Sequence, residues 1–84
     1  MILSVYSDGK HRMMITKGHH GFKIGEFSDG FFVGVPPGIG FSKLEKAQKA
    51  LDDRADDKGW KWIGKQEEAE IYRYRTKGKN VTYD

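Results

Sequence analysis

The 84-residue chain is too short to build two hydrophobic cores, so it is expected to form a single domain over residues 1–84. It contains no cysteine, which excludes disulfide bonds and thiolate metal sites and fits a reducing, cytoplasmic compartment. Fifteen Lys and Arg against twelve Asp and Glu give a net charge of +3, which permits a nucleic-acid partner without requiring one.

The first 35 residues predict an antiparallel meander of short strands. The N-terminal apolar run ends before Asp8, far too early for a signal segment or a membrane span, so no membrane contact is expected. Asp-Gly pairs tolerate the positive φ angles of tight hairpin turns, which predicts turns at Asp8-Gly9 and Asp29-Gly30. The strands are expected at Ile2–Tyr6, His11–Thr16, Phe22–Phe27 and Phe31–Val35.

An amphipathic helix is predicted next, over Lys43–Lys58. The segment Pro36–Gly40 ends the preceding strand, and Ser42 with Glu45 three residues later has the pattern of a capping box. Gly59 supplies a C-terminal stop. The spacing predicts one buried face, made of Leu44, Ala47, Leu51 and Ala55.

After the helix, strands are expected at Trp60–Ile63 and Glu70–Thr76, with the polar stretch Gly64–Ala69 between them. Residues 77–84 are expected to fray or to form a short final strand. A single amphipathic helix needs the face of a sheet to cover its apolar stripe. The predicted fold is therefore α+β: one antiparallel sheet of about four to six short strands, with the helix packed on one face.

No catalytic constellation is visible in the sequence, and we predict that the protein is not an enzyme. The serines fall in predicted strands, turns or a helix cap, and no nucleophile motif surrounds them. His11, His19 and His20 lie in or beside turns and lack partners at metal-ligand spacing, so neither a metal nor a cofactor is expected. The segment Pro36–Gly40 matches no phosphate-binding fingerprint and is interpreted as a change of chain direction.

Four aspartates form an acidic ridge in the C-terminal half of the helix. They oppose the helix dipole and place like charges four residues apart, so helix stability does not explain them. We interpret the ridge as a docking surface for a protein with a basic surface, the alternative being a solvated helix face. Its members are Asp52, Asp53, Asp56 and Asp57.

A basic and aromatic run near the C-terminus supports an alternative, nucleic-acid binding. In a strand, Tyr72 and Tyr74 share one face and Arg73 shares the other with the next arginine. Cations of this kind neutralise phosphates, and exposed aromatic rings stack on bases. The candidate residues are Lys61, Arg73, Arg75, Lys77 and Lys79.

The stretch Gly21–Ala55 resembles a pattern of small phage and prophage accessory proteins, in which a hairpin precedes a helix of the form F-S-x-L-E-x-A-x-x-A-L-D, here Phe41 to Asp52. It is also similar to the three-strand-plus-helix DNA-binding domains of phage-type integrases, although this hairpin offers Lys23 alone where those domains present basic and polar side chains. The resemblance implies a mobile-element origin and stoichiometric association with a host protein, as an inhibitor or modulator of the anti-CRISPR kind. A nucleic-acid-binding module is the alternative and an unrecognised enzyme the third; the partner and the oligomeric state stay open.

Overall fold

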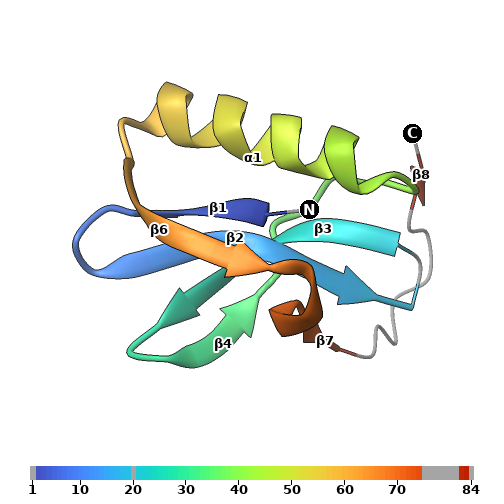
Figure 1. Ribbon diagram of the computed structural model, residues 1–84, viewed down its shortest axis with the longest axis horizontal. Coiled ribbons are helices and arrows are strands. Elements are labelled where there is room, and N and C mark those ends of the chain that lie inside the picture. The colour runs from blue at the N-terminus through green and yellow to red at the C-terminus, as the bar shows by residue number, and fades with distance from the viewer. Residues whose placement is uncertain (1, 20, 75–81, 84) are drawn as a thin grey trace.

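Residues 2–19, 21–74 and 82–83 are described by the structure, a computed structural model, in which one helix lies across one face of a sheet (Figure 1). The elements are β1 (Ile2–Ser7), β2 (His11–Gly18), β3 (Gly21–Ser28), β4 (Phe31–Gly34), β5 (Ile39–Gly40), α1 (Leu44–Lys58), β6 (Lys61–Glu67), a 3₁₀ turn η1 (Glu68–Glu70), β7 (Tyr72–Arg73) and β8 (Thr82–Tyr83). The α+β prediction is confirmed.

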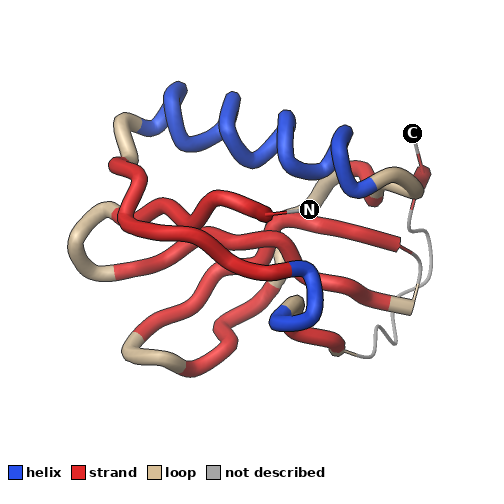
Figure 2. The backbone as a smooth tube through the Cα atoms, viewed as in Figure 1, coloured by secondary structure: helices blue, strands red, loops and turns tan. Residues whose placement is uncertain are grey.

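The main sheet has the strand order β4-β3-β2-β1-β6, and all of these neighbours are antiparallel. β7 joins the far half of β2 in parallel, while β5 and β8 form a separate two-stranded parallel pair. The four strands of the N-terminal meander were predicted from sequence. The tube in Figure 2 shows how β6 returns from the helix to lie along β1, at the opposite edge of the sheet from β4.

Two hairpin turns carry the Asp-Gly pairs that predicted them. Asp29 and Gly30 both have positive φ, 52° and 81°, as a two-residue hairpin turn requires. In the first turn, the Asp8 carboxylate accepts hydrogen bonds from the main-chain N–H groups of Lys10 (2.8 Å) and His11 (2.6 Å). These bonds, that from His11 first, lower the pKa of the Asp8 carboxyl to about 2.

The helix begins one residue later than predicted, and the predicted capping box is wrong. The N-cap is Lys43, whose extended backbone (φ −110°) precedes Leu44, and no side chain makes a capping bond there. Ser42 lies one position too early to take that role. The C-terminal prediction is confirmed, because Gly59 adopts the left-handed conformation (φ 72°), and its N–H and the next one bond back to carbonyls of the last turn.

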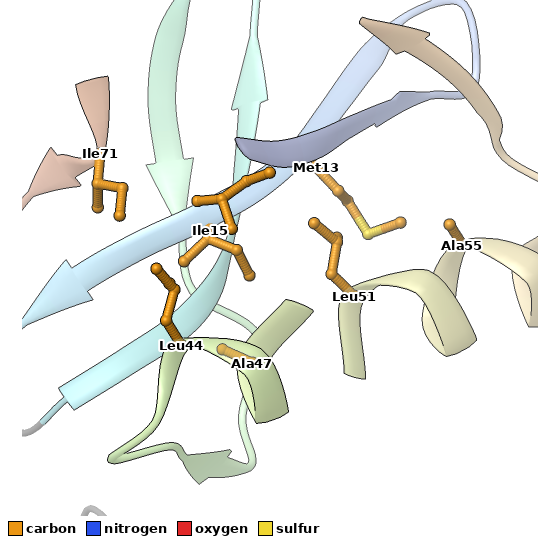
Figure 3. Close-up of a cluster of buried hydrophobic side chains, with 8 residues drawn as sticks. Met13, Ile15, Leu44, Ala47, Leu51, Ala55 and Ile71 are labelled. Carbon is orange, nitrogen blue, oxygen red and sulfur yellow. The ribbon is translucent and has the colours of Figure 1, made fainter. Parts of the chain in front are cut away.

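The core lies between α1 and the sheet (Figure 3). The predicted helix face is buried and packs against Leu3, Met13 and Ile15 from the strands before the helix, and against Ile71 after it. This confirms that the stripe faces residues from both sides of the helix in sequence. The helix residues in this cluster are Leu44, Ala47, Leu51 and Ala55.

A second cluster, made of aromatic rings, covers part of the opposite face of the sheet. Phe32 lies 4.8 Å from Tyr72 and 5.3 Å from Tyr74 between ring centroids, and 5.4 Å from Phe27. Because both tyrosines contact Phe32, Tyr72 and Tyr74 share a face, as predicted. Side chains alternate along a strand, so Thr16, next to the core residue Ile15, also points to this face. Both faces of the central strands are therefore packed.

Candidate functional site

The structure divides the predicted acidic ridge of α1. The Asp52 carboxylate accepts hydrogen bonds from the Tyr6 hydroxyl and from the Gln48 amide, each at 2.7 Å, so it ties the helix to β1. Burial, followed by the bond to Asp52, raises the pKa of the Tyr6 hydroxyl. Asp52 thus has a structural role in addition to any part in binding.

The other three acidic residues are exposed. Asp53 pairs with Lys49 at 3.2 Å, in a bridge whose two side chains are both largely in solvent, and Asp56 and Asp57 lie along the last turns. An exposed pair of this kind contributes roughly 0–1 kcal/mol to folding. Asp53, Asp56 and Asp57 are therefore the part of the ridge that a partner can reach.

The predicted basic set is spread over the sheet. Lys61 lies opposite Ser7 of β1, and Ser7 lies opposite Arg12 of β2. Arg73 lies opposite Lys17, also on β2. Arg12 and Lys17 are five residues apart along β2, about 17 Å at ~3.4 Å per residue. The structure thus does not bring Lys61 and Arg73 together. Arg75, Lys77 and Lys79 lie outside the described residues.

The edge strand β4 is a feature that sequence reasoning did not single out as a site. Among the described residues it pairs only with β3, and its sequence Phe-Phe-Val-Gly carries no charge. Phe31 is 77% exposed and Val33 63% exposed, on the face that α1 would cover if it reached this far. A hollow of about 410 Å³ separates the strand from the helix and is lined by Val33, Pro36, Arg54 and Lys58, among others.

A cleft opens on the sheet where β1 parts from β2. The two strands pair near their shared turn as far as Tyr6 and Met13, and further along β2 the neighbouring strand is β7. Beyond the last β1–β2 pair lies a cleft of about 350 Å³, with Val5, Met14 and Ile63 as its apolar lining. This volume lies near the lower end of the range of small-molecule sites.

Gln66 is one of the polar residues that line this cleft. It is 5% exposed, and its amide N–H₂ group donates to the Glu70 carbonyl at 3.3 Å and contacts the Met14 sulfur at 3.5 Å. The amide oxygen of Gln66 is buried and has no hydrogen-bond partner. A buried acceptor without a donor costs stability, which makes this atom unusual among folded proteins. Its position in a polar stretch of sequence gave no hint of burial.

The described residues hold no cluster of three or more metal-ligating side chains. Within the same part of the chain, no helix is long and apolar enough to cross a membrane. The ring of His11 lies 3.3 Å from the Asp8 carboxylate, beside the first turn.

Comparisons with protein-family models, with curated proteins and with solved structures find no match to this chain.

Proposed function

We propose that the protein acts by stoichiometric association with a partner protein and that the edge strand β4 is the principal docking surface. The observation that carries this proposal is the combination of an open strand edge with two exposed apolar side chains, Phe31 and Val33. Natural sheets commonly blunt their edges with lysine, proline or a covering element. β4 has no lysine or proline within Phe31–Gly34, and no described element covers its edge, although the strand is short and its ladder with β3 is irregular at Glu26 and Phe27. The open edge favours pairing with another chain.

Strand addition explains both features of this edge. An extended segment of the partner would continue the hydrogen-bond ladder of the sheet, and its alternate side chains would pack on Phe31 and Val33. The hollow beside them carries Arg54 and Lys58, so acidic side chains on the partner strand would be favoured there. Glu26 accepts one hydrogen bond from Arg54 at 3.5 Å and offsets part of this charge.

The test is a capture experiment with matched variants. Val33→Lys places a charge on the exposed edge, and Ile2→Lys makes the same change at an exposed apolar residue of a strand at the other side of the sheet. We expect a protein captured from host lysate in a one-to-one ratio by the wild type and by Ile2→Lys, but lost with Val33→Lys. Equal capture by all three proteins would contradict docking at β4, provided that circular dichroism shows each to be folded.

Nucleic-acid binding is the second candidate, supported by the place of Arg73. It lies opposite Lys17, and the neighbouring Tyr72 is an exposed aromatic ring. If Arg73 contacts phosphate, Arg73→Gln should weaken binding to single-stranded DNA or RNA and lower the slope of log affinity against log salt by about one. Fluorescence anisotropy at low salt that shows no binding would dismiss this candidate. The phage-type origin remains a prediction of the resemblance.

A further inference from the structure

We propose that the cleft between β1 and β2 is a binding site for an acidic peptide segment with a central apolar residue. This site is separate from the β4 edge, and it combines three features in one place. They are an apolar lining, a buried acceptor without a donor, and cations at the rim. Each feature is matched by a group that such a peptide carries.

The apolar lining would take one aliphatic side chain. Val5 and Met14 lie on the two strands that part, and Ile63 of β6 is 47% exposed at the mouth of the cleft. Covering such surface with a leucine side chain is favourable in proportion to the apolar area removed from water. Among the described residues no strand pairs with Met14 on the side of β1, and residues 63–66 of β6 form the other wall of the cleft.

The Gln66 amide oxygen calls for a hydrogen-bond donor. Its own N–H₂ group is already occupied by the Glu70 carbonyl, and the Glu70 carboxylate accepts a bond from the main-chain N–H of Glu67 at 3.0 Å. A main-chain N–H of an extended peptide can supply this donor only if the Gln66 side chain shifts, because its oxygen is buried and a shift weakens the bond to the Glu70 carbonyl. The site thus has a main-chain contact in addition to its side-chain pocket.

The rim selects an acidic ligand. Arg12 and Lys65 line the cleft itself, and two further hollows that share Ile63 are lined by Lys10 and Lys61. Three carboxylates line the same surfaces, Glu70 in the cleft and Asp8 and Asp29 in the two hollows, so the four cations outnumber them by one. This balance favours carboxylates on either side of the apolar residue.

A nucleic acid fits this site less well than a peptide. Its phosphates would suit the cations, but the residues that line the cleft include no aromatic ring on which a base could stack, and the aromatic rings of this face are stacked on one another instead. The peptide is therefore the occupant that accounts for all three features.

The experiment measures binding of synthetic peptides to the full chain by isothermal titration calorimetry at low salt. The probe is an acetylated and amidated peptide of sequence DDLDD, compared with KKLKK and DDGDD. We expect DDLDD to bind one-to-one and the other two to bind at least about fivefold more weakly. Absence of DDLDD binding at millimolar concentration, or equal binding of DDGDD, would overturn the proposal.

Charge-reversal variants locate the site. Lys65→Glu and Arg12→Glu should each weaken DDLDD about fivefold, the effect of losing one partly exposed ion pair. Lys43→Glu, an equal charge change at the start of α1, should leave the affinity unchanged. Equal weakening by all three variants would show that net charge alone attracts the peptide and would overturn the assignment of the cleft.

Gln66→Leu tests the buried acceptor. We expect a folded protein that binds DDLDD at least about fivefold more weakly, because the donor in the peptide loses its partner. Unchanged affinity in a folded variant would contradict the role of Gln66. If Gln66→Leu fails to fold, Ile63→Ser at the exposed mouth should still weaken DDLDD, and its failure to do so would overturn the site. Displacement of DDLDD by oligo-dT with the same dependence on Lys65 would assign the cleft to nucleic acid instead.

Discussion

A compensating pair of substitutions on the aromatic face of the sheet gives a sharp test of the packing. A methyl group placed on Gly25 would overlap the Thr16 methyl group, Cγ2, on the neighbouring strand. Thr16 is fully buried, and its hydroxyl donates to the Lys23 carbonyl at 2.9 Å. Because threonine is stiff at χ1, it cannot turn its methyl group away without breaking that bond.

Gly25→Ala should therefore destabilise the protein by about 1–3 kcal/mol, the usual cost of one extra methyl group in a packed site. In a domain of this length each kcal/mol lowers the melting temperature by roughly 4–8 °C. Thr16→Ser alone should cost about 1 kcal/mol, since it removes one buried methyl group. That substitution also removes the atom with which the new methyl group would collide.

The double variant Gly25→Ala with Thr16→Ser should be less destabilised than the sum of the two single changes, by about 1 kcal/mol or more. Urea unfolding of the four proteins measures this coupling directly. A Gly25→Ala variant as stable as the wild type would refute the close approach of β2 and β3 at this point. Strict additivity of the two changes would refute the pairwise contact.

Three other changes test the helix and the first turn. Leu51→Ala should cost about 2–5 kcal/mol in a chemical unfolding experiment because Leu51 is fully buried, and an unchanged midpoint would place it outside the core. The double variant Asp53→Lys, Asp57→Lys should have an unchanged or slightly higher melting temperature, since cations suit a helix C-terminus. If the acidic ridge docks a basic partner, the same variant should lose association in the capture experiment. Unchanged capture would show that the ridge is a solvated helix face. Because the pKa of Asp8 is lowered, the ionised carboxylate stabilises the fold above about pH 4, and this stabilisation is lost as the pH falls from about 4 to about 2. Asp8→Asn should therefore flatten the dependence of folding stability on pH in that range. A pH profile identical to that of the wild type would contradict this.

The parts of the fold that sequence predicted are those with local causes. Asp-Gly pairs tolerate the positive φ that a tight turn needs, and the spacing of apolar residues marks the buried face of the helix. Both features could therefore be predicted without a structure. The prediction after the helix was wrong in part, because the strand expected at Trp60–Ile63 continues as β6 to Glu67, and the strand expected at Glu70–Thr76 is only Tyr72–Arg73 within the described residues. β6 is an edge strand of which only Gln66 is buried, and its polar sequence lacks the alternation of a half-buried strand. The predicted Ser42 cap was wrong because the chain enters the helix one residue later.

The candidate sites were less predictable because they depend on contacts between distant residues. The distance between Lys61 and Arg73 follows from strand register, which a single sequence does not reveal. Asp52 resembles its acidic neighbours in the sequence, yet only the structure pairs it with Tyr6. The cleft arises because β1 leaves β2 partway along, and no local motif marks that point.

The pairing of β1 with β6 also has consequences for how the protein folds. Ile2 lies opposite Glu67, so this ladder joins segments that are separated by most of the chain. Closing so long a loop is slow, whereas the β2–β3–β4 meander and the helix need only nearby residues. We expect the meander to form early, while one edge of β1 stays unpaired until β6 has formed. During that interval the unpaired edge of β1 can pair with another chain. The pairing of β6 with β1 should therefore limit the rate of refolding and set how strongly folding intermediates aggregate as the protein concentration rises.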